Sequence, residues 1–130
     1  MGDTMDLQTL KQYLNNKVGT TEAFPFGPEV AVFKVLGKMY ALVPWAEDPL
    51  RVNLKCDPEY AEVLRATYPA AVLPGYHMSK KHWNTVMFDG TIPREEILSM
   101  VDDSYDLIVK SMTKANQRKL AEMLRPDQKQ

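Results

Sequence analysis

The sequence has little cysteine, no long apolar run and no surplus of positive charge, and each shortage narrows the possible functions. A single cysteine, Cys56, excludes a disulfide within the chain and favours a cytoplasmic location. No apolar run approaches the ~20 residues that span a bilayer, so we expect no membrane segment. The formal net charge of -1 differs from the large positive surplus typical of nucleic-acid-binding proteins. A local basic face would still allow such binding.

Motifs for catalysis are also scarce. The phosphate-cradling patterns Gly-x-x-x-x-Gly-Lys and Gly-x-Gly-x-x-Gly are absent. The pairs Glu95-Glu96 and Asp102-Asp103 fall on a predicted helix, where adjacent positions do not face each other, so neither is typical of an acid/base pair. Cys56 ends an apolar strand, where burial favours a structural role over a nucleophilic one. We therefore predict no enzymatic activity and no cofactor.

The two histidines, His77 and His82, lie five residues apart. No cysteine is nearby, and no carboxylate stands at a metal-ligand spacing within the same segment. The pattern favours packed or hydrogen-bonded histidines and predicts no metal site.

The length and composition fit a single folded domain. The chain has 130 residues, of which 45% are hydrophobic and 25% charged, which is enough for a real core. We place the domain at residues 6–124, with flexible ends at 1–5 and 125–130, and expect a monomer.

Capping residues and hydrophobic spacing predict four helices and four strands. Asp6 caps the first helix, and Asp57 followed by Pro58 caps the second. The predicted helices cover residues 6–18, 58–68, a segment from 93 past 108, and 113–124. The predicted strands cover residues 29–35, 39–43, 51–56 and 85–88, while 20–28 and 70–83 are predicted loops.

The spacing of apolar residues also predicts which sides are buried. In the strand 51–56, Val52, Leu54 and Cys56 should face the core, with Arg51, Asn53 and Lys55 on a solvent-exposed side. In the second helix, the expected buried stripe is Tyr60, Val63, Leu64 and Thr67.

The order of these elements determines the fold class. The first three strands have short connections, which suit antiparallel rather than parallel pairing. We predict a two-layer α+β fold, in which helices cover one face of an antiparallel sheet of about four to five strands.

The segment from Pro74 to Asn84 is the best candidate for a functional site because it combines basic and aromatic side chains. Lysine and histidine would contact phosphates while tryptophan stacks on a base or sugar, and Arg51 and Lys55 would extend the patch. Alternatively, Trp83 and Tyr76 pin the loop to the core and the lysines are only solvated. The candidate residues are Arg51, Lys55, Tyr76, His77, Lys80, Lys81, His82 and Trp83.

Several separated pieces of the sequence resemble the MmcQ/YjbR family of small bacterial proteins. They are Asn53–Glu59, Pro74–Val86, Asp89-Gly90 and Asp103–Asp106, in that order. The resemblance implies a curved antiparallel sheet backed by helices, similar to that of secretion chaperones. It also implies a non-enzymatic DNA-binding protein with a double-wing motif, with Lys55, His77, Lys80, His82 and Trp83 at the motif positions.

A protein-interaction module is the alternative function. A sheet of this kind can offer its open face or an edge strand to a peptide. The exposed side of the hairpin formed by residues 29–43, with Phe33 or Tyr40, would then be the contact surface.

Overall fold

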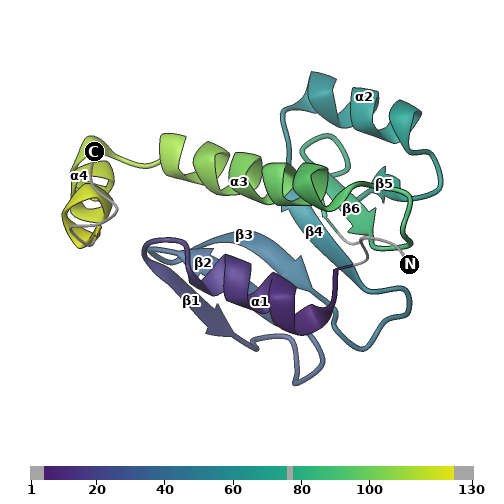
Figure 1. Ribbon diagram of the computed structural model, residues 1–130. Helices are drawn as coiled ribbons and strands as arrows, with labels where there is room; N and C mark the ends of the chain where they lie inside the picture. Colours follow the sequence, from purple (N-terminus) through teal and green to yellow (C-terminus); the bar gives the residue numbers. More distant parts are fainter. Residues whose placement is uncertain (1–4, 76–77, 125–130) are drawn as a thin grey trace.

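The computed structural model describes residues 5–75 and 78–124 (Figure 1). The helices in this part of the chain are α1 (Leu7–Asn15), α2 (Pro58–Thr67), α3 (Arg94–Lys110) and α4 (Lys114–Met123). The strands are β1 (Thr20–Ala23), β2 (Ala31–Val35), β3 (Lys38–Val43), β4 (Arg51–Lys55), β5 (Val72–Pro74) and β6 (Trp83–Met87).

All six strands form one antiparallel sheet in the order β1-β2-β3-β4-β6-β5. Helices α1 and α3 lie across one face of this sheet (Figure 1). We call that face the helix side and the opposite face the loop side. The two-layer α+β fold predicted from the sequence is confirmed.

The hydrophobic core fills the space between the sheet and the helices. Its buried members come from all layers of the fold and include Leu10, Leu14, Phe33, Val35, Val43, Val52, Leu54, Val86, Ile97, Val101 and Ile108. Met5, which the sequence analysis placed in a flexible end, is 1% exposed and belongs to this core. The ordered packing therefore begins before the first helix.

The predicted helix starts are confirmed by their capping bonds. The side chain of Asp6 accepts a hydrogen bond from the backbone N–H of Thr9 at 2.8 Å. The side chain of Asp57 accepts one from Glu59 at 3.1 Å, with Pro58 in the first turn. Both bonds satisfy helix N–H groups that have no partner within the helix.

The predicted buried stripe of α2 is confirmed for Leu64 and wrong for its other three residues. Tyr60 and Val63 are 45% and 54% exposed, whereas Ala61 and Leu64 are the buried residues of this helix. The small side chain of Ala61 lets the helix approach the layer beneath it closely. The larger apolar residues therefore remain at the surface, and Arg65 follows Leu64 on the inner side.

The sheet has two more strands than the four located in the sequence, and both lie in predicted loops. Strand β1 has four residues and contains Thr and Glu, while β5 has three and ends in Pro74. Such short strands carry too little alternation to be recognised. Both are edge strands, where a proline without an N–H is tolerated.

A serine hydroxyl from α3 is inserted between β3 and β4. These strands pair only at Ala41 with Leu54 and at Leu42 with Asn53, so the next pair in register would be Tyr40 with Lys55. At that position the N–H of Lys55 donates to Oγ of Ser104 at 2.9 Å. The same Oγ donates to the carbonyl of Tyr40 at 2.6 Å. The hydroxyl of Ser104, which is 0% exposed, thus replaces a bond of the ladder.

Helix α1 is fastened to α3 through Asp102. The hydroxyl of Tyr13 donates to the Asp102 carboxylate at 2.7 Å, and Nζ of Lys17 lies 2.6 Å from the same oxygen. Burial, together with this bond, raises the pKa of Tyr13 to about 12, so the phenol remains a donor across the physiological range. The first helix is therefore held by the third.

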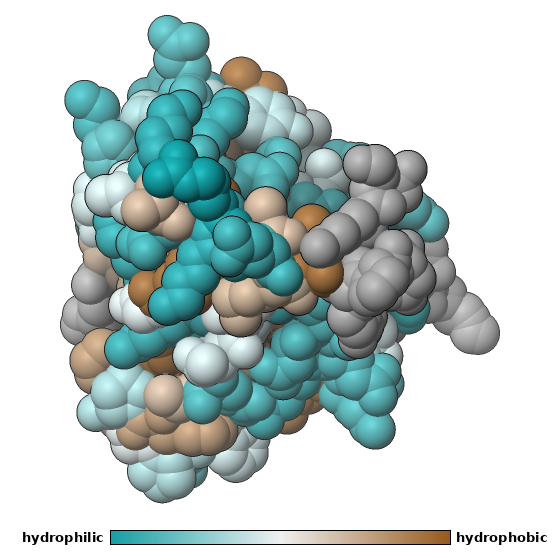
Figure 2. All heavy atoms as spheres, turned by 90° about the vertical axis from the view of Figure 1, so that its left-hand side faces the viewer, coloured by the Kyte–Doolittle hydropathy of each residue, from teal (hydrophilic) through white to brown (hydrophobic). Residues whose placement is uncertain are grey.

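Helix α4 covers one end of the sheet. Its one buried residue is Leu120, and a Cβ added to Gly19 would lie 2.6 Å from a methyl carbon of that leucine. Viewed from this end, the surface is mostly hydrophilic, with apolar side chains in small separated patches (Figure 2). The exposed side of α4 is accordingly mostly polar, although Met123 is 47% exposed.

Candidate nucleic-acid interface

Lys55 and Trp83 lie directly opposite each other on β4 and β6. Side chains of such an antiparallel pair have Cβ atoms about 4.5–5.5 Å apart and share one face of the sheet. Because Val52 and Leu54 face the core, alternation places Lys55 and Trp83 on the loop side. Both are half-buried. The fold therefore brings together two predicted site residues that lie far apart in the sequence.

The three residues before Trp83 are exposed and add positive charge to this corner. They are Lys80, Lys81 and His82. A tight turn holds them, since the N–H groups of His82 and Trp83 both donate to the carbonyl of Ser79, at 3.2 and 2.9 Å. The N–H of Cys56 donates to the carbonyl of His82 at 2.8 Å, which joins the turn to the end of β4.

We call the set Lys55, Lys80, Lys81, His82 and Trp83 the basic corner. Tyr76 and His77, the remaining loop candidates, lie outside the described residues.

Arg65 of α2 anchors the basic corner to the rest of the fold, and the sequence analysis missed it. Its Nε donates to Oδ1 of Asn84 at 2.7 Å. One terminal nitrogen donates to the carbonyl of Lys80 and to that of Trp83, the latter at 3.3 Å. Three hydrogen bonds thus fix the path of the loop. The available signal was its position four residues after the small, buried Ala61, on the inner side of the helix.

Gly75 allows the chain to lie close beside Trp83, one residue beyond the last pair of β5 and β6. A Cβ at Gly75 would lie 2.8 Å from Cβ of Trp83, and the Gly75 N–H donates to the Trp83 carbonyl at 2.8 Å. The backbone of Trp83 therefore holds the start of the loop at Gly75. Trp83 is only half-buried, so part of this residue also remains accessible to solvent.

Arg51 does not join the basic corner. It lies at the other end of β4, opposite Met87, and its Nε donates to the carbonyl of Pro49 at 3.1 Å. Lys55 is four residue steps away along the strand, or about 13 Å. The loop side between them is also less exposed than predicted: Asn53 is 4% exposed and accepts a bond from Thr85 Oγ1 at 2.5 Å.

Acidic side chains gather on helices α2 and α3, and one of them, Asp103, lines the same small space as Lys55 of the basic corner. Helix α3 carries Asp102, Asp103 and Asp106, and α2 carries Glu59 and Glu62. Burial, and then the charges of Asp106 and Asp102, raise the pKa of Asp103. The net charge near zero therefore combines the cations of the basic corner with carboxylates on the neighbouring helices.

A sequence model of the YjbR family matches residues 15–107. The chain belongs to the YjbR family. Among curated relatives, YjbR of Escherichia coli K12 is 32% identical over 119 residues, covering 92% of this chain and all of the relative. YbdF of Escherichia coli O157:H7 is 36% identical over 97 residues, covering 75% and 79% of the two chains.

Solved structures show the same fold for this YjbR-family chain. Deinococcus radiodurans protein DR2400, described as a DUF419 domain, superposes with a TM-score of 0.85 and 43% identity, covering 90% of this chain and 88% of that one. A Pseudomonas syringae protein matches with a TM-score of 0.65 and 32% identity, covering 79% of this chain and 98% of that one. The family predicted from separated sequence pieces is confirmed.

Cys56 of this YjbR-family protein is buried and not activated. Burial, with smaller contributions from the charges of Asp103 and Asp57, raises the pKa of its thiol to about 11. It lines a small space between α2 and α3, with only about 10 Å³ for the centre of a water molecule. Nδ2 of Asn84 also borders this space and finds no acceptor within residues 5–75 and 78–124.

The hairpin residues predicted as a contact surface are buried. Phe33 and Tyr40 are both 0% exposed. The Tyr40 hydroxyl donates to the carbonyl of Leu14 at 2.9 Å, and its ring meets that of Tyr105 edge-on with centroids 5.2 Å apart. They face the helix side because α1 and α3 cover it, so this prediction is wrong.

In the two stretches that the structure describes, no three His, Cys, Asp or Glu side chains gather in a way that could hold a metal ion. No helix in those same stretches is long and apolar enough to cross a membrane.

Proposed function

We propose that this protein is a small, non-enzymatic DNA-binding protein that contacts DNA through the basic corner. The pairing of Lys55 with Trp83, beside the exposed Lys80 and Lys81, carries the proposal. Ammonium groups neutralise phosphates, and the half-buried Trp83 would offer its indole to a sugar or base. A DNA ligand also agrees with the cytoplasmic location expected from the sequence.

Fluorescence anisotropy with labelled DNA, offered both as single strand and as duplex, tests this proposal. Three lysines that neutralise three phosphates should give a slope of log K against log[salt] of about -3 for duplex and about -2 for single strands. Changing Lys55→Gln, Lys80→Gln and Lys81→Gln together should remove most of this slope and of the affinity.

A second triple variant provides the matched control. Lys110, Lys114 and Lys119 are exposed cations at the end of α3 and on α4, at the far end of the molecule from β5 and β6 (Figure 1). Their change to Gln alters the net charge equally but leaves the basic corner intact. Equal weakening by both triples, or no affinity below ~100 µM at low salt, would contradict the proposal.

The protein-interaction alternative retains one favourable observation. Edge strand β5 pairs only with β6 in the sheet, and its Leu73 is 39% exposed. An added strand from a partner peptide would hydrogen-bond to such an edge. Recovery of one specific protein in a nuclease-treated pull-down, lost on changing Leu73→Lys, would favour this function instead.

A further inference from the structure

An exposed phenylalanine stands on the connection between β1 and β2. Phe26 is 68% exposed, the most exposed large apolar side chain among the described residues. It occupies the third position of a turn in which the N–H of Gly27 donates to the carbonyl of Phe24 at 3.3 Å. Pro25 at the second position of that turn restricts the backbone.

A neighbouring connection braces this turn. The indole Nε1 of Trp45 donates to the carbonyl of Pro28 at 2.9 Å, which ties the segment after β3 to the segment before β2. Phe26 is therefore presented by a restrained backbone. Because a restrained backbone has less conformational entropy to lose on binding, this exposed residue is well suited to contact a ligand.

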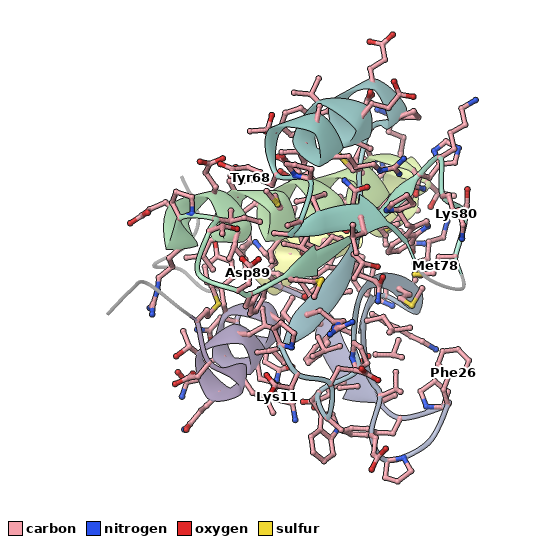
Figure 3. The ribbon with its side chains drawn as sticks, turned by 90° about the vertical axis from the view of Figure 1, so that its right-hand side faces the viewer. Lys11, Phe26, Tyr68, Met78, Lys80 and Asp89 are labelled. Atoms are coloured by element: carbon pink, nitrogen blue, oxygen red, sulfur yellow. The ribbon has the colours of Figure 1, made fainter. Side chains whose placement is uncertain are left out.

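Phe26 lies on the same side of the molecule as the basic corner. Figure 3 shows Phe26, Met78 and Lys80 along one side, with Lys11 and helix α1 on the other. Phe24, two residues earlier, belongs to that other side: its ring lies 5.7 Å from Nζ of Lys11. The loop side therefore combines an aromatic ring, a thioether and the lysines of the basic corner.

We propose that the nucleic acid is single-stranded, with bases that stack on Phe26 and Trp83 while the backbone follows the lysines. The inference rests on the proposed function and adds the strand state of the ligand. Duplex DNA keeps its base faces stacked inside the helix, so it offers phosphates to the lysines but no base to an exposed aromatic ring. A single strand offers both, and every base has a face that can stack, so binding tolerates sequence.

The test compares two probes and two variants by anisotropy. The probes are a labelled 15-nucleotide oligo-dT and the same strand annealed to its complement, at equal low salt. We expect the single strand to bind at least about tenfold more tightly than the duplex. Phe26→Ala should weaken single-strand binding by about 5- to 150-fold, the range for loss of one stacked base.

Phe24→Ala is the matched control, because it removes an equal ring from the opposite side of the same turn. It should change single-strand affinity by less than about twofold. Since the Phe26 side chain is mostly exposed, circular dichroism should show that both variants remain folded.

The outcomes separate this inference from the proposed function. Equal binding of the two probes, or an unchanged affinity of Phe26→Ala, overturns the single-strand inference but leaves DNA binding in place. Binding of neither probe overturns both. A third outcome is that both probes bind and that the lysine triple variant loses affinity for the duplex alone. This would assign the basic corner to duplex DNA and would also overturn the inference.

Discussion

Removal of the Ser104 hydroxyl should test how the sheet is held together at its centre. Ser104→Ala leaves the carbonyl of Tyr40 without its donor in a buried site and the N–H of Lys55 without its acceptor in a partly buried one. A buried polar group left unpaired costs about 1–3 kcal/mol. Since one of the two groups is less buried, we expect a total loss of about 2–4 kcal/mol from the free energy of unfolding.

Urea unfolding followed by tryptophan fluorescence would measure this loss. The midpoint should fall at an unchanged m value, because the native surface stays the same. Ser111→Ala is the control: this hydroxyl donates to the Ile108 carbonyl at 2.6 Å at the end of the same helix, where water can replace it. It should cost less than about 0.5 kcal/mol. A loss below about 1 kcal/mol for Ser104→Ala would refute the reasoning and mean that β3 and β4 close to pair directly.

Two further predictions concern the surroundings of the basic corner. Arg65→Met should speed amide hydrogen exchange in residues 78–83, because three anchoring hydrogen bonds are lost. The control Arg118→Met changes an exposed arginine and should leave this exchange rate unchanged. Equal protection in both variants would contradict the anchoring role of Arg65. Cys56 should react with a disulfide reagent at least about 100-fold more slowly than an unfolded cysteine at pH 8, since burial keeps the thiol protonated. Because the pKa in the folded state is raised to about 11 from 9.0, the stability contributed by the neutral thiol should fall as pH rises through about 9 to 11. Rapid labelling in the native protein would contradict this.

The sequence predicted the features that depend on residues close together in the chain. Asp6 and Asp57 cap helices because their side chains reach N–H groups a few residues away, and these contacts can be read from the sequence. Val52 and Leu54 face the core as their alternation predicts. In α3, Ile97, Val101 and Ile108 are all buried, and their spacing in the sequence is that of one helix face.

Features that depend on distant partners escaped prediction. Strand β1 exists because β2 offers it an edge, and its own four residues carry little β-pattern. Asn53 was expected to be solvent-exposed on the loop side, yet its side chain is buried and accepts a hydrogen bond from Thr85 of β6. Arg65 was passed over because its three acceptors become neighbours only after α2 has docked beside β6. Lys55 and Trp83, in contrast, were both named, although only the strand register makes them a pair.

The attachment of α1 to Asp102 has a consequence for folding during synthesis. The contacts from Tyr13 and Lys17 to that carboxylate span 89 and 85 residues. During synthesis α1 leaves the ribosome before α3. Its contacts with Asp102 can therefore form only after most of the chain has been made. Nascent molecules that stall before α3 should consequently remain open to chaperones and proteases, and folding should be slow for a protein of this length.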